Sequence, residues 1–242
     1  YKVSLDNDVV ASITDAASIM IKFGSDTNPH HVACLAHAIH LVVCDVLYKS
    51  QENNIREGNK EYEENEEFDV EDEENDVSNA DEESTEEKSS KLIPELQNII
   101  IKVRKIVKLF RRSPVCNDEN LQPQNTKTLG KEKNLLLDCK TRWNSLLKML
   151  QRFYEMRKGI QVAMIQIECQ FDLSDQELDK IKDLCDALAP LEIATQYLCQ
   201  EDADLILADK ILAFTLNKLK DINTPIGNSL FQRFKIRIQE RR

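Results

Sequence analysis

The stretch Leu92–Arg112, LIPELQNIIIKVRKIVKLFRR, decides the fold class because its apolar residues repeat at helical spacing. They stand at positions 92, 93, 96, 99, 100, 103, 106, 107 and 110, which places them along one side of an α-helix. The other side is cationic, and its members are Lys102, Arg104, Lys105, Lys108, Arg111 and Arg112. The stretch therefore predicts a helix that buries one face in a core and presents a basic face as a candidate surface for phosphates.

Downstream of this helix the sequence predicts more helices. Ser113–Pro114 ends the basic helix, and we expect the polar residues 115–134 to form a loop. The expected elements that follow are a helix from Thr141 through Met164, a helix begun by the capping box Ser174–Glu177 and stopped before Pro190, and helices over roughly 205–222 and 225–241, the last opened by Thr224–Pro225.

The first fifty residues indicate a small amount of strand. The expected elements are a buried strand over 9–14 that ends at Asp15, a helix over 16–23 that Gly24 ends, a turn over 26–29 and a helix over 32–47. A single strand needs partners that this chain does not supply, so we expect Tyr1 to be a cut point inside a fold. With only 5 glycines in 242 residues an all-β fold is disfavoured, and the expected class is α+β, mostly α.

Residues 51–91 differ in composition from the rest of the chain. They hold 18 Asp and Glu against 4 Lys and Arg, a local balance of −14, whereas the whole chain carries −11, so the remainder is mildly basic at +3. Such a segment cannot bury enough apolar surface to offset the entropy of ordering its backbone, and we expect it to be disordered. It is either a passive spacer or an acidic docking tail for a basic partner.

Several classes of protein lack their sequence signals here. No phosphate-binding P-loop, no serine nucleophile elbow and no zinc-protease HExxH motif occurs. No apolar run is long enough to span a membrane, so we expect no membrane partner. The 7 cysteines include no CxxC pair, which fits a reduced compartment, the cytosol or the nucleus.

Two groups near the N-terminus could carry chemistry, and each has a plainer interpretation. Asp15 follows a strand, where α/β folds place metal-binding carboxylates, but Thr14–Asp15 is also a plausible helix cap. His31, Cys34, His37 and His40 recur every third residue on the expected helix. Cys34 and His37 could bind zinc with help from elsewhere, and the alternative is helix packing with a buried, hydrogen-bonded His37.

The third group is Arg142 and Trp143, the only tryptophan of the chain, at an expected helix start. The plainer interpretation is that Trp143 anchors the core. The sharper one is a platform on which an unpaired base stacks, with Arg142 for phosphate, because indole faces stack on bases and guanidinium groups pair with phosphates.

These segments, in this order, resemble the transposase domain of the hAT superfamily (the hobo/Activator group) and its host-domesticated relatives with BED zinc fingers. The matching residues are Thr14–Met20, Cys34–His37, Lys102–Ser113, Thr141–Ser145, Met149–Leu150 with Arg152, and Leu191–Leu198. The resemblance covers nearly the whole chain outside residues 51–91, and the matches to T-R-W-N-S and C-L-A-H are specific when taken together.

The resemblance implies a partial RNase H-like core of one or two strands over residues 1–50, the acidic disordered insert 51–91, and an all-α insertion domain over 92–242. Family chemistry is DNA cleavage and strand transfer by two divalent cations, Mg²⁺ or Mn²⁺, held by an Asp-Asp-Glu triad. Asp15 matches the second Asp of that triad, so the resemblance makes it the catalytic and metal-holding residue of this chain.

The resemblance also implies roles for other residues. Cys34 and His37 match a motif that lies near the active site, and Trp143 matches an aromatic residue that stabilises a flipped base. Arg142 and the six basic residues of 92–112 would form the DNA-facing surface with it.

Departures from the family pattern concern the catalytic residues. The other two triad carboxylates would lie before Tyr1 and after Arg242, and the two Asn that accompany the Asp are Ala16 and Ile19 here. We therefore expect a fragment of a hAT-type transposase, or of a transposase-derived nuclear DNA-binding protein, that is inactive alone and homo-oligomeric in its full-length form. The alternative is a domesticated, non-catalytic nuclear factor that binds DNA or proteins.

Overall fold

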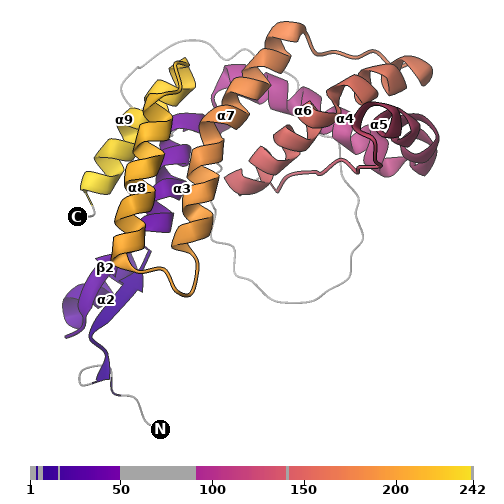
Figure 1. Ribbon diagram of the computed structural model, residues 1–242. Coiled ribbons are helices and arrows are strands. Elements are labelled where there is room, and N and C mark those ends of the chain that lie inside the picture. The colour runs from indigo at the N-terminus through magenta and orange to yellow at the C-terminus, as the bar shows by residue number, and fades with distance from the viewer. Residues whose placement is uncertain (1–3, 5–7, 16, 50–90, 140–141, 241–242) are drawn as a thin grey trace, which may run out of the picture.

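The computed structural model describes residues 4, 8–15, 17–49, 91–139 and 142–240, and most of them are helical (Figure 1). The α+β, mostly α class expected from the sequence is confirmed. The expectations for residues 51–90 and for Thr141 fall outside the described residues. No described helix combines the length and the apolar character that crossing a membrane requires.

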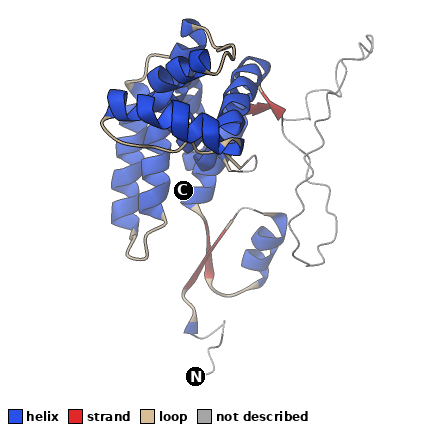
Figure 2. Cartoon of the chain, turned by 90° about the vertical axis from the view of Figure 1, so that its right-hand side faces the viewer, coloured by secondary structure: helices blue, strands red, loops and turns tan. Residues whose placement is uncertain are grey.

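Two short parallel strands and a helix extend from one end of the helical part (Figures 1 and 2). β1 (Ala11–Thr14) pairs with β2 (His30–Ala33), and α2 (Ser18–Asp26) connects them. The prediction of a lone, buried strand is wrong. Ile13 on β1 is 71% exposed because β2 is the only strand paired with β1 among the described residues. The second half of β2, residues 32 and 33, was expected to begin a helix over 32–47, because a short apolar run alone does not distinguish a strand from a helix.

The sequence suggested that Gly24 ends the helix before the turn. In the structure α2 continues to Asp26. The glycine serves a close contact instead. A Cβ atom at Gly24 would lie 2.3 Å from Cγ of His31, so only glycine lets α2 approach β2 at this point.

Four helices lie side by side in one half of the helical part (Figure 1). They are α3 (Leu35–Leu47), α7 (Asp175–Leu198), α8 (Leu205–Lys220) and α9 (Pro225–Gln239). Asp45 on α3 accepts two hydrogen bonds from the guanidinium of Arg237 on α9, at 2.9 and 3.0 Å. A single hydrophobic cluster runs from α3 to α9.

The other half holds α4 (Pro94–Arg112), the π-helical turn η2 (Cys116–Leu121), α5 (Gln122–Leu129) and α6 (Trp143–Gln166). β3 (Tyr48–Lys49) and β4 (Lys91–Leu92) form an antiparallel pair directly before α4. The expectation of a loop over 115–134 is wrong for most of that range. Its polar residues suggested a loop, but Gln122, Gln124 and Asn125 are buried, and Gln122 and Asn125 hydrogen-bond to residues 133 and 134.

Helix starts were predicted well, and one helix end was not. Ser174 and Glu177 form the expected capping box, and the Thr224 side chain accepts the Gly227 N–H at the start of α9. The helix expected to stop before Pro190 instead continues to Leu198. Pro190 is buried between Leu188 and Leu191, both 0% exposed, so tertiary packing offsets the hydrogen bond that proline cannot donate.

Candidate nucleic-acid interface

The structure brings the N-terminal candidate residues to one edge of the β1–β2 sheet. Because the two strands are parallel and Thr14 is opposite Ala33, Asp15 and Cys34 both follow the ends of their strands. The Cys34 N–H donates to Thr14 O at 2.7 Å, and His37 lies in the first turn of α3. Asp15 and Cys34 thus lie at the same end of the sheet, and His37 follows in α3.

Asp15 is exposed, and its Oδ1 accepts a hydrogen bond from the Ala17 N–H at 3.2 Å just before α2. The N-cap of α2 is Ala17 and no side chain caps the helix, so Asp15 is not the N-cap that the sequence offered as the plainer interpretation, although it bonds to the backbone just before the helix. Among the described residues no group of three or more His, Cys, Asp or Glu is placed to hold a metal ion. The donor set at this edge thus does not fit Mg²⁺ or Mn²⁺, which need several oxygen ligands, and we derive no metal-dependent step from it.

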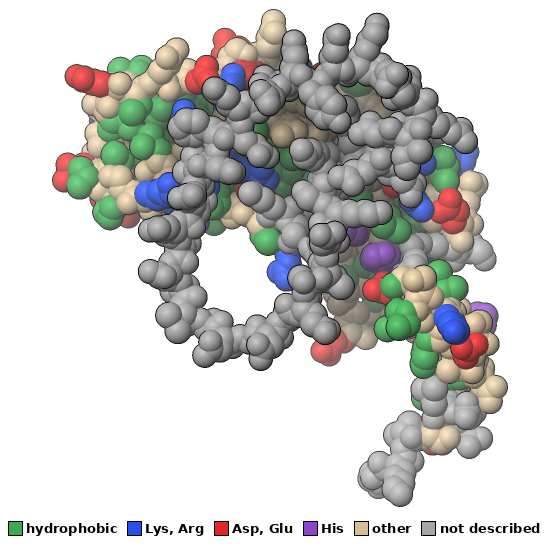
Figure 3. Space-filling model, turned by 180° about the vertical axis from the view of Figure 1, so that it is seen from behind, with side chains coloured by type: hydrophobic (Ala, Val, Ile, Leu, Met, Phe, Trp, Pro, Cys, Tyr) green, Lys and Arg blue, Asp and Glu red, His purple; other side chains and the backbone are tan. Residues whose placement is uncertain are grey.

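The sequence suggested that His31, Cys34, His37 and His40 lie on one helix, but the structure divides them between a strand and a helix. His31 is on β2, with Nε2 2.7 Å from Oγ1 of Thr14, because the chain is still extended at that point. His37 and His40 are on α3, half-buried, with ring centroids 5.9 Å apart. Burial and the neighbouring His37 lower the pKa of His40, whose Nε2 lies 3.4 Å from Sγ of Cys44. Figure 3 shows histidine side chains where the β1–α2–β2 extension meets the helices. These contacts are those of a packing cluster.

The basic face of α4 divides into two edges and an outward strip. At one edge, Nζ of Lys102 donates to Oε1 of Glu177 at 3.0 Å, and this hydrogen bond raises the pKa of Lys102. At the other edge, Arg104 forms a two-pronged ion pair with Asp138, Nε to Oδ1 at 2.8 Å and Nη2 to Oδ2 at 2.5 Å. Both edge cations are thus bonded within the chain, whereas the sequence placed all six on a DNA-facing surface.

The outward strip is defined here as the other four cations of α4, Lys105, Lys108, Arg111 and Arg112. Arg111 is seven residues after Arg104 and therefore lies on the same edge of the helix, two turns further along. Lys108 is half-buried and the other three side chains are exposed. The members are three or four residues apart along α4, or adjacent, so their charges share one side of the helix. On the opposite side Val103, Val107 and Phe110 are at most 1% exposed and fix the helix in the core.

Residues 133–139, which we call the strap, cross from α5 toward α6 along the Arg104 edge of α4. The strap begins at Lys133, whose N–H and C=O both bond to the side chain of Gln122, each at 3.0 Å. Nη1 of Arg152 donates to Asn134 O at 2.7 Å. The Asp138 carboxylate is only 2% exposed in its pair with Arg104. Sequence reasoning missed the strap, because bonds between distant residues leave no local pattern.

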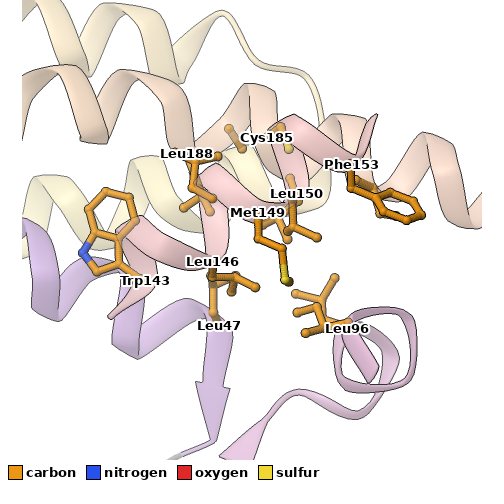
Figure 4. Close-up of a cluster of buried hydrophobic side chains, with 14 of the residues drawn as sticks. Leu47, Leu96, Trp143, Leu146, Met149, Leu150, Phe153, Cys185 and Leu188 are labelled. Atoms are coloured by element: carbon orange, nitrogen blue, oxygen red, sulfur yellow. The ribbon is translucent and has the colours of Figure 1, made fainter. Parts of the chain in front are cut away.

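Arg142 and Trp143 stand at the junction of the strap and α6. Trp143 is 4% exposed and belongs to the hydrophobic core, and Figure 4 shows it at one end of the cluster that includes Leu146 and Leu188. The structure thus places Trp143 as the core-anchor interpretation requires, and a base could stack on its indole only if the side chain left the core. Arg142 is exposed.

Comparisons with known proteins agree with this architecture. The family profile of the ZBED1 RNase-like helical domain matches residues 32–187. The human protein "Zinc finger BED domain-containing protein 4" is 26% identical over 112 residues, which cover 46% of this chain and 9% of that protein, so the match spans about a tenth of the relative. No solved structure gives a significant match. The chain therefore belongs to the ZBED1 RNase-like helical domain family, a branch of the hAT-derived, BED zinc finger-related transposases.

Proposed function

We propose that this chain is the helical part of a transposase-derived nuclear protein and that it binds duplex DNA through the outward strip of α4. The observation that carries the proposal is the strip itself, four cations on a helix whose other two basic residues on this face, Lys102 and Arg104, are held in ion pairs. Phosphate neutralisation by such a row supplies affinity without sequence selectivity and makes binding strongly dependent on salt. The nuclear location is inferred from the BED zinc finger in the name of the human relative.

Duplex DNA fits this surface better than unpaired bases. Phe110 is the only aromatic residue between positions 92 and 139, and it is 1% exposed. Trp143 is likewise buried. A binding site for single strands combines cations with exposed aromatic rings, and this surface offers cations alone.

Replacing two strip residues tests the proposal. The variant Lys105→Gln/Arg111→Gln is expected to reduce the slope of log Kd against log salt by about 2, because each lost phosphate contact removes about one unit. Fluorescence anisotropy with a labelled duplex between 50 and 200 mM salt measures the slope. The matched control is Lys182→Gln/Lys210→Gln, two exposed lysines on α7 and α8. Equal slopes for the two double variants would remove the strip from DNA binding.

We further expect the purified chain to show no cleavage of its own. Asp15 is one exposed carboxylate without companion ligands among the described residues, and two divalent cations need several carboxylate oxygens. Incubation with a DNA hairpin and Mg²⁺ or Mn²⁺, followed by a denaturing gel, measures nicking. Metal-dependent nicking that Asp15→Ala abolishes would contradict this expectation and favour a catalytic fragment. Homo-oligomerisation of the full-length protein stays a prediction.

A further inference from the structure

The strap ends in a turn that fixes Arg142. The Arg142 N–H donates to Cys139 O at 3.0 Å, which closes the turn between the strap and α6. Oγ of Ser145 accepts the Cys139 N–H at 2.8 Å and lies 2.7 Å from Arg142 O, so one hydroxyl bonds to both ends of the turn. These hydrogen bonds link the backbone of Arg142 to that of Cys139, so a displacement of Cys139 would also displace Arg142.

Asp138 is the residue that ties this turn to α4. It directly precedes Cys139, and its carboxylate holds Arg104, which is one helical turn before Lys108 on the same side of α4. The pair also neutralises the one carboxylate that the strap would otherwise place beside the strip. Tyr48 lies near the pair, since both Arg104 and Asp138 influence the pKa of its hydroxyl, which burial raises.

We propose that Asp138 is a positioning residue for DNA binding. It holds the strap against α4 through Arg104, and the end of the strap in turn fixes the backbone of Arg142, an exposed cation at the start of α6 that adds a fifth phosphate contact to those of the outward strip. The partner is the phosphate backbone of duplex DNA, and the inference rests on the proposed function. Arg104 thereby acts within the protein and not on DNA.

A double-mutant cycle in the full 242-residue chain tests the coupling. Arg142→Gln is expected to reduce the salt slope by about 1, which is a fourfold smaller loss of affinity between 50 and 200 mM salt. Asp138→Asn, which keeps the shape of the side chain and removes its charge, is expected to give the same reduction. Because Asp138 acts through Arg142, the combined variant is also expected to lose about 1, not about 2.

Two further measurements separate positioning from general stability. Ser145→Ala releases the other end of the turn without removing a buried charge, so it is expected to reduce the slope by about 1 even where Asp138→Asn folds poorly. Trp143 is the only tryptophan, so its emission reports the start of α6 alone. Asp138→Asn is expected to shift that emission to the red and increase its quenching by acrylamide, whereas the control Lys210→Gln leaves both unchanged.

The outcomes are distinguishable. Two results would overturn the positioning role while the strip continues to bind DNA. The first is a salt slope reduced by about 2 in both double variants, Asp138→Asn/Arg142→Gln and Ser145→Ala/Arg142→Gln. The second is an unchanged salt slope in both single variants, Asp138→Asn and Ser145→Ala. The proposed function fails separately, through an unchanged slope in Lys105→Gln/Arg111→Gln, and the positioning role then falls with it.

Discussion

Replacing Trp143 by alanine is expected to lower the free energy of unfolding by about 3–5 kcal/mol, because the indole is 4% exposed and its removal leaves a cavity at the start of α6. For a chain of this size that corresponds to a melting temperature lower by roughly 6–20 °C. Thermal unfolding followed by circular dichroism measures the change. At a temperature where the variant is still folded, we expect its affinity for duplex, hairpin and single-stranded DNA to fall by one common factor.

The control is Trp143→Phe, which keeps an aromatic ring in the same place and is expected to recover most of the stability. If the indole instead stacks on a flipped base, Trp143→Ala would unfold at nearly the normal temperature and would lose affinity for hairpin DNA selectively. The two interpretations that the sequence left open for Trp143 therefore give opposite pairs of results.

Local signals explain which parts of the fold could be predicted. The apolar spacing of Leu92–Arg112 identified α4 almost to the residue, and the capping residues Ser174 and Thr224 marked the starts of α7 and α9. These signals depend on neighbours within one or two helical turns. A short stretch of sequence therefore contains all the information needed to predict these elements.

The elements that were missed depend on contacts between distant residues. The strand at His30–Ala33 forms because β1 offers a partner, and Pro190 is tolerated inside α7 because the helix packs on both sides of it. The helical turns after Ser113 bury Gln122 and Asn125 against the strap. In each case contacts between distant residues outweighed a local preference, and no single stretch of sequence contains those contacts.

The candidate interface shows the same division. Periodicity correctly placed six cations on one face of α4, but it could not show that Lys102 is bonded to a residue 75 positions away and Arg104 to one 34 positions away. It also left the burial of Trp143 undecided. The sequence thus indicated the basic surface, and the structure adds that Lys102 and Arg104 form ion pairs within the protein.

Arg104 is expected to be far more costly to remove than the lysine beside it, although both are basic residues of one helix. Arg104→Ala leaves the carboxylate of Asp138, 2% exposed, without its cation, and loss of one member of a buried pair costs about 3–5 kcal/mol. Lys105→Ala, at an exposed position, is expected to change the free energy of unfolding by no more than about 0.5 kcal/mol. Urea unfolding at pH 7 measures both.

A paired replacement shows whether the cost comes from the orphaned charge or from lost packing. Arg104→Met/Asp138→Leu removes both charges and keeps side-chain volume, and buried ion pairs replaced in this way often lose little stability. We therefore expect the double variant to be more stable than Arg104→Ala by at least about 2 kcal/mol. A double variant as unstable as Arg104→Ala would mean that the two-pronged geometry itself holds the strap. In that case Arg142 would lose its position even when no charge is left unpaired, and its contribution to the salt slope would vanish in the double variant as well.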